Sequence, residues 1–100
     1  MRLIDAARVI RSKNAGPLQL TVDLMFPDIS GFQAAAASAN LTPAALAALY
    51  GVAEDTVTVI PFEAAYAIKI VIDRPIVAGT PGDRDVYGAQ QHAPLLGLEL

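Results

Sequence analysis

The side chains best suited to chemistry gather in residues 86–94, which read Val-Tyr-Gly-Ala-Gln-Gln-His-Ala-Pro. This segment holds the only histidine of the chain, His92, directly after Gln90 and Gln91 and close to Tyr87. Two amides and an imidazole offer several hydrogen-bond donors and acceptors at once. Such a loop could fold over a polar ligand or bind to neighbouring backbone, and the residues alone leave both uses open.

His92 is the first candidate for proton transfer, because an unperturbed histidine titrates near neutral pH. The structural alternative is that His92 and the two glutamines only tie the loop to backbone carbonyls. A metal site is not expected, since no carboxylate or second histidine stands at ligand spacing from His92. The glycines of a dinucleotide site are missing, and we expect no cofactor. The turn of a serine nucleophile is missing as well, so the chain does not identify itself as a complete enzyme.

A second polar cluster, Arg-Ser-Lys-Asn-Ala-Gly-Pro at residues 11–17, precedes the first clear strand pattern. If it forms a turn, Ser12, Lys13 and Asn14 would converge with free backbone N–H groups near Gly16. That arrangement can hold a carboxylate or a phosphate. The same residues are also ordinary turn composition, so an anion site and a plain turn both remain open.

Composition narrows the classes of partner. The chain is 54% hydrophobic and only 17% charged, with a net charge of −3, against roughly 25% charged residues in an ordinary domain. Scattered basic residues and a net negative charge argue against nucleic acid and anionic membranes. Low charge favours association, and we expect a homo-oligomer or a larger complex. No apolar run approaches the ~20 residues of a membrane helix.

The absence of cysteine and the N-terminal residues bear on the cellular compartment of the protein. The chain contains no cysteine, so disulfides are excluded. Charges within Met1–Asp5 break up any signal-peptide core, and we expect a cytoplasmic protein. One hundred residues suffice for one core, which predicts a single α+β domain over residues 1–100.

Periodicity predicts the elements. Alternating apolar residues predict strands over 18–26, 57–62 and 67–73, the last two joined as a hairpin, with Pro61 indicating an edge strand or a bulge. Helices are expected over 29–39 and over 43–50, the second bounded by Thr42, Pro43 and Gly51. The spacing in Leu3–Ile10 predicts a helix, although Ala7–Ile10 fits an extended strand equally well. Residues 74–93 are expected to form a long loop, and residues 95–100 a final strand.

This order of elements is typical of a ferredoxin-like α+β sandwich, in which an antiparallel or mixed four-stranded sheet carries helices on one face. Asp23 and Lys69 fall on the polar sides of two predicted strands. We expect them to form a salt bridge across the sheet.

The chain resembles domain-of-unknown-function family 4387. The resemblance rests on Arg-Ser-Lys-Asn-Ala-Gly-Pro at 11–17, Leu-Thr-Pro at 41–43, Leu-Tyr-Gly at 49–51, Ala-Ile-Lys at 67–69 and, most specifically, Gly-Ala-Gln-Gln-His-Ala-Pro-Leu at 88–95. Members of this family look like companions of acyclic terpene utilisation A-type proteins and are similar to the small ferredoxin-like domain at the C-terminus of some of them. The resemblance implies that Leu3–Ile10 is partly strand.

The same resemblance implies a function. It points to the small subunit of a two-component enzyme acting on carboxylic acids or acyl-CoA compounds, with the Ser12 turn and the Gln90–His92 loop completing or capping the active site of the large subunit. Two alternatives stay open. One is a free-standing oligomeric binding or regulatory module, and the other is a small hydratase or isomerase that uses His92 as its base.

Overall fold

Two central strands carry the core of the computed structural model, which describes residues 1–15, 19–73 and 93–100. Strand β2 (Gln19–Met25) pairs antiparallel with β4 (Ala67–Asp73), with Val22 opposite Ile70. Because strand side chains alternate between the two faces, every second residue of each strand points to the same side of the sheet. These inward-facing residues are all at most 1% exposed: Leu20, Val22, Leu24, Ile68, Ile70 and Ile72.

Strands β1 (Val9–Asn14) and β3 (Val57–Phe62) complete the sheet in the order β1-β2-β4-β3, and all neighbours are antiparallel. It follows that β2 and β3 run parallel on either side of β4. Helices connect β2 to β3, which is the split β-α-β arrangement of ferredoxin-like folds. The α+β prediction is confirmed, and Pro61 lies in an edge strand as expected.

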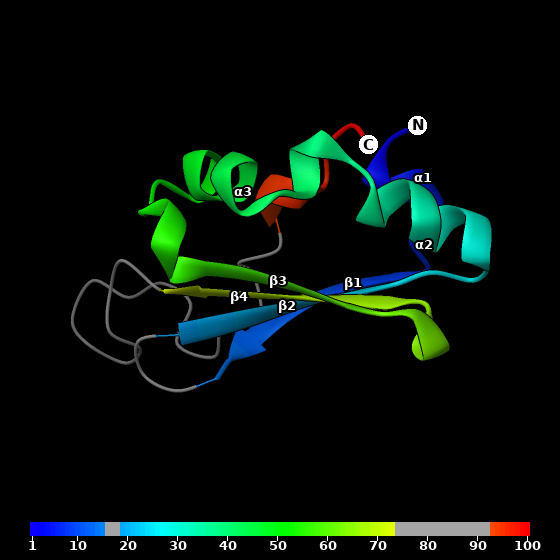
Figure 1. Cartoon of the computed structure of the whole chain (residues 1–100), viewed down its shortest axis with the longest axis horizontal. Helices are drawn as coiled ribbons and strands as arrows, with labels where there is room; N and C mark the ends of the chain where they lie inside the picture. Colours follow the sequence, from blue (N-terminus) through cyan, green and yellow to red (C-terminus); the bar gives the residue numbers. More distant parts are fainter. Residues whose placement is uncertain (16–18, 74–92) are drawn as a thin grey trace.

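The helices α1 (Leu3–Ala6), α2 (Ile29–Ala36) and α3 (Pro43–Tyr50) all lie over one face of the sheet (Figure 1). We call this side the inner sheet face and the opposite side the outer sheet face. Helix α3 has the bounds predicted from sequence: the Thr42 hydroxyl accepts a bond from the Ala45 N–H at 3.3 Å, and Gly51 takes a left-handed φ of 69°. Helix α2 ends at Ala36, before the end of the predicted range.

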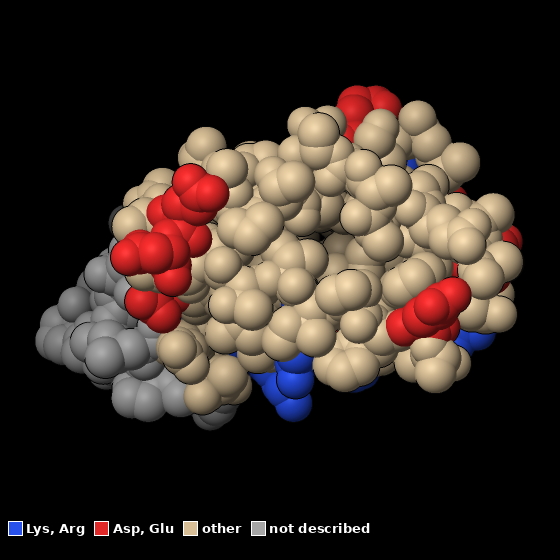
Figure 2. Space-filling model, viewed as in Figure 1, with Lys and Arg blue, Asp and Glu red and all other residues tan. Residues whose placement is uncertain are grey.

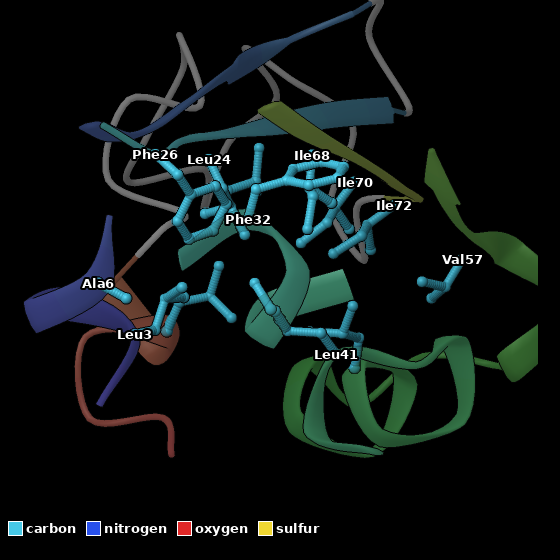
Figure 3. Packing of buried hydrophobic residues seen from close by; sticks show 14 of the residues in the cluster. Leu3, Ala6, Leu24, Phe26, Phe32, Leu41, Val57, Ile68, Ile70 and Ile72 are labelled. Atoms are coloured by element: carbon cyan, nitrogen blue, oxygen red, sulfur yellow. The ribbon is translucent and has the colours of Figure 1, made fainter. Parts of the chain in front are cut away.

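The helix layer closes the core mainly with large leucine and phenylalanine side chains, among which Leu3, Phe32 and Leu41 are labelled in Figure 3. Leu3, Leu46 and Leu95 are each fully buried against the strand residues. Phe32 of α2 packs edge-on against Phe26, with ring centroids 6.4 Å apart and planes at 75°. Ala35 of α2 is completely buried, and its small side chain allows the helix to approach the sheet closely, whereas Ala34 and Ala36 are exposed.

The β3–β4 hairpin is the predicted one, joined through a 3-10 turn at Glu63–Ala65. Tyr66 follows this turn in the left-handed region, at φ 49°. This conformation costs a residue with a Cβ atom roughly 1–2 kcal/mol. Its ring packs near Phe32 at 6.4 Å, and its carbonyl accepts the Phe26 N–H at 2.8 Å, so contacts with the core offset the strain.

Two predictions at the chain ends were wrong. The helix expected over Leu3–Ile10 stops at Ala6, and β1 begins at Val9, which agrees with the partly stranded segment that the family resemblance implied. The strand expected over 95–100 is a 3-10 turn at Ala93–Leu95 followed by a single bridge from Glu99 to Arg2. The Leu98 N–H closes a turn onto the Leu95 carbonyl at 3.1 Å. That local bond prevents an extended ladder.

We predict that Ile70→Ala lowers the free energy of unfolding by about 2–5 kcal/mol, because Ile70 is completely buried on the inner sheet face and its removal leaves a cavity. Ile60→Ala is the matched control, since Ile60 is only half-buried and lies on the outer sheet face. Urea unfolding of both variants measures the difference. Equal losses would contradict the assignment of the two faces.

We also predict an acid-dependent contribution from Asp28, which caps α2 by accepting the Gly31 N–H at 2.9 Å. This bond, followed by the bond from Ser30, lowers the pKa of Asp28 below 3.8. A lowered carboxyl pKa stabilises the fold above the unfolded-state value, and this contribution is lost as the pH falls through the folded-state value. The melting temperature of Asp28→Asn should therefore fall less than that of the unmodified protein between neutral pH and a pH below 3.8. Parallel pH profiles would contradict this.

Candidate functional site

The predicted Ser12–Lys13–Asn14 cluster lies on a strand. All three residues belong to β1, where Ser12 pairs with Val22 and Asn14 with Leu20. Their side chains therefore share the inner sheet face with the core, whereas Lys13 points to the outer sheet face. The expectation that the three side chains converge in a turn was wrong, because β2 supplies a ladder for residues 9–14.

Ser12 and Asn14 are the polar end of the inner sheet face. Ser12 is 8% exposed and Asn14 is half-buried, at positions where β2 and β4 carry only aliphatic residues. Both side chains have interaction partners in the structure. A hydroxyl and an amide here can bind a polar ligand group or a neighbouring backbone, but the adjacent Lys13 ammonium lies on the other side of the sheet.

The rest of the predicted site lies outside the described residues. This holds for Gly16, Tyr87, Gln90, Gln91 and His92. A pocket shared by the Ser12 segment and the Tyr87–His92 loop therefore stays a prediction.

The outer sheet face carries a row of charged residues across three strands. Arg11, Asp23 and Lys69 stand side by side in the register of β1, β2 and β4. Arg11 Nε lies 3.4 Å from Asp23 Oδ2, and the Asp23 side chain is only 19% exposed. Asp23 thus pairs with Arg11. The sequence had suggested a salt bridge between Asp23 and Lys69, and that prediction was wrong, because no ion pair joins the two among the described residues. Arg11 was missed because β1 had not been predicted.

Thr21 lies beside this charged row and has a buried hydroxyl. It is 5% exposed, and its Oγ1 atom has no hydrogen-bond partner among the residues that the structure describes. The register places it between Lys13 and Val71, with Thr58 farther along the same row. A buried hydroxyl without a partner costs about 1–3 kcal/mol.

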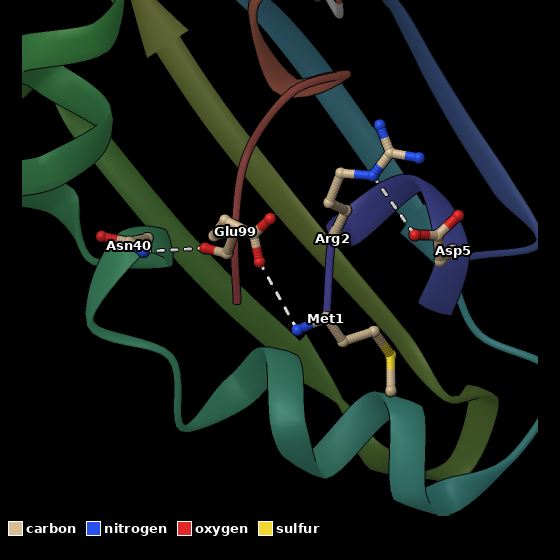
Figure 4. Close-up of polar contacts among 5 residues, drawn as sticks. All are labelled: Met1, Arg2, Asp5, Asn40 and Glu99. Carbon is tan, nitrogen blue, oxygen red and sulfur yellow. Dashed lines mark hydrogen bonds and ion pairs between the residues drawn. The ribbon is translucent and has the colours of Figure 1, made fainter.

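A groove on the helix side lies between α3 and the C-terminal segment. It has a volume of about 390 Å³, and its lining includes Asn40, Ala45, Leu49, Leu98 and Glu99. The Asn40 side-chain amide donates to the Glu99 carbonyl at 2.7 Å, and the Met1 ammonium lies 3.4 Å from the Glu99 carboxylate (Figure 4). No sequence signal predicted this groove, because Asn40 and Glu99 lie 59 residues apart in the chain.

Proton transfer finds little support among the described titratable groups. Hydrogen bonds to Gly31 N–H and to Ser30 lower the pKa of Asp28, and burial raises the pKa of Tyr50. Both shifts stabilise the state that each group already has at neutral pH, which is the ionised carboxylate for Asp28 and the neutral phenol for Tyr50. Residues 1–15, 19–73 and 93–100 contain no group of three carboxylate, histidine or cysteine side chains that could hold a metal ion.

The split β-α-β sheet and its single helix layer define the class of protein, an α+β domain of ferredoxin-like type. The family model for the domain of unknown function DUF4387 matches residues 3–99, and the chain therefore belongs to that family. No curated protein and no solved structure matches it. No described helix is long and apolar enough to cross a membrane.

We predict that Thr21→Val raises the free energy of unfolding by about 1 kcal/mol, because an isosteric methyl group replaces a buried, unpaired hydroxyl. For a domain of this size, that gain corresponds to roughly 4–8 °C in melting temperature. Thr58→Val is the matched control, since Thr58 lies in the same row of the outer sheet face but is exposed. Thermal unfolding would contradict the prediction if Thr21→Val melted at or below the temperature of Thr58→Val.

Proposed function

We propose that this protein is the small subunit of a two-component enzyme and completes or caps the active site of a larger chain. The observation that carries this proposal is the polar end of the inner sheet face. Ser12 and Asn14 occupy core-facing positions on an edge strand. Both residues already have partners within the chain, and a hydroxyl and an amide at the edge of a sheet can in addition bind a ligand or a partner that meets this edge.

Family membership supports the same proposal. The chain belongs to the DUF4387 family, and its motifs resemble those of small companions of acyclic terpene utilisation A-type proteins. On this basis, we propose such a protein as the large subunit, and carboxylic acids or acyl-CoA compounds as substrates. The Gln90–His92 segment is the second proposed contribution to the site, with His92 as the proposed proton-transfer group.

We further propose that the small subunit self-associates and that it resides in the reducing cytoplasm. The low proportion of charged residues supports self-association, and the lack of cysteine is consistent with a reducing compartment. Apolar side chains also remain accessible on the helix side, among them Leu49 and Leu96 at 43% and 40% exposure. Surfaces of this kind often mark sites of association.

We expect the purified chain alone to show no turnover of carboxylic acids or their acyl-CoA thioesters, and activity to appear when it is mixed with the A-type large subunit. The reason is that the proposed site is shared between the two chains. Co-purification of tagged large subunit, followed by activity assays of the separate and mixed chains, measures this. In the complex, His92→Gln should reduce turnover by roughly a hundredfold if His92 transfers a proton.

Three outcomes of this experiment would distinguish the subunit proposal from its alternatives. Turnover by the small chain alone that disappears in His92→Ala would replace the subunit proposal with a stand-alone hydratase or isomerase. A stable oligomer that ignores the large chain would favour a binding module instead. Activity of the His92→Gln complex within a few-fold of the unmodified complex would remove His92 from the catalytic candidates while leaving the subunit proposal intact.

A further inference from the structure

The outer sheet face carries several exposed side chains, and no described helix covers it. Figure 1 shows α1, α2 and α3 on the other side of the sheet. Arg11, Lys13 and Thr58 of this face are exposed, and the Phe62 ring is 49% exposed. These residues belong to the two edge strands, β1 and β3, so the surface extends across the whole width of the sheet.

Charge separates this surface from the rest of the molecule. It carries three of the five described lysine and arginine residues, Arg11, Lys13 and Lys69, but only two of the eight described acids, Asp23 and Asp73. In Figure 2, the largest basic patch projects at the lower edge of the molecule, with smaller ones at the right-hand end and near the top, whereas acidic side chains lie at the ends and at the top. The outer sheet face thus has an excess of positive charge on an acidic protein.

The positive charge is also available to a partner. Arg11 already neutralises Asp23 at 3.4 Å. Lys13 and Lys69 form no ion pair among the described residues. Both stand close to Asp23 and Thr21 in the register. Two lysines near a carboxylate that Arg11 already neutralises leave a local excess of positive charge, which attracts negatively charged groups of a partner.

The outer sheet face also carries apolar residues of the kind found in protein interfaces. Val9, Met25, Ala67 and Phe62 form the neighbouring cross-strand row, and Ile60 continues the charged row onto β3. Aromatic, methionine and arginine side chains are enriched where proteins meet, with charged groups around them.

We propose that the outer sheet face is the docking surface for the larger chain, and that the facing surface of that chain presents carboxylates to Lys13 and Lys69. This inference rests on the proposed function: a large chain docked on this face reaches Ser12 and Asn14 of the inner sheet face around the edge strand β1. A second copy of this chain is a poorer occupant, because it would bring the same excess of positive charge against Lys13 and Lys69. An acidic surface gains attraction where the second copy meets repulsion.

The test uses the full small chain and the A-type large subunit, with affinity measured by titration calorimetry at two salt concentrations. Lys69→Glu and Lys13→Glu should each weaken binding by roughly tenfold or more, because each turns an attraction into a repulsion. Arg8→Glu is the matched control. It carries the same change of charge at an exposed residue outside the outer sheet face, and it should bind within about threefold of the unmodified protein, as a remote surface charge contributes little.

Binding by the unmodified protein should also weaken as salt increases, and this dependence should be reduced in Lys69→Glu. Circular dichroism and melting curves establish that each variant is folded. Lys13→Glu, on an exposed edge position, keeps the test decisive if Lys69→Glu fails to fold.

The outcomes separate the two proposals. If the unmodified protein binds the large chain and both lysine variants bind as tightly as Arg8→Glu, the docking surface is wrong and the subunit proposal stands. If the unmodified protein does not bind the large chain, both proposals fail. If the small chain self-associates and Lys69→Glu dissociates it, a second copy occupies this face and the acidic partner is wrong.

Discussion

The pairing of β2 with β4 is the constraint on which the rest of the structure depends. These two strands present aliphatic side chains in matched register on the inner sheet face, so a shift by one residue would turn every one of them toward the outer sheet face. The register fixes more than the core. It also places Asp23 beside Lys69 and Thr21 beside Val71 on the opposite face. One pattern of alternation therefore sets both the buried layer and the surface chemistry.

Local signals made most of the central architecture predictable. Alternation identified β2 and β4, and a capping threonine, a proline and a glycine defined α3. These signals lie within a few residues of the element they specify. β1 was missed because the strand is at the edge and polar residues occupy two of its inward positions, Ser12 and Asn14. Its apolar pattern is therefore too short to distinguish it from a turn.

The candidate site was harder to predict than the fold because its geometry comes from pairing between distant segments. Sequence proximity suggested that Lys13 acts with Ser12 and Asn14, but strand alternation divides them between opposite faces. The same alternation brings Lys13 near Thr21 and adds Arg11 to Asp23. Composition identified the residues that could bind an anion, and only the β1–β2 register shows which of them can act on the same ligand.

The strand order also has a consequence for how the chain folds. β1 with β2 and β3 with β4 are pairs of consecutive strands, and each can form from neighbouring chain segments. Among the ladders between described strands, the β2–β4 ladder is the non-local one: it joins Leu24 to Ile68 across both helices α2 and α3. Loop-closure entropy must be overcome before that ladder gains any burial energy. The expected slow step of folding is then the docking of two preformed hairpins, and substitutions that weaken either hairpin, in the outer strands β1 and β3 as well as in β2 and β4, should act on the folding rate.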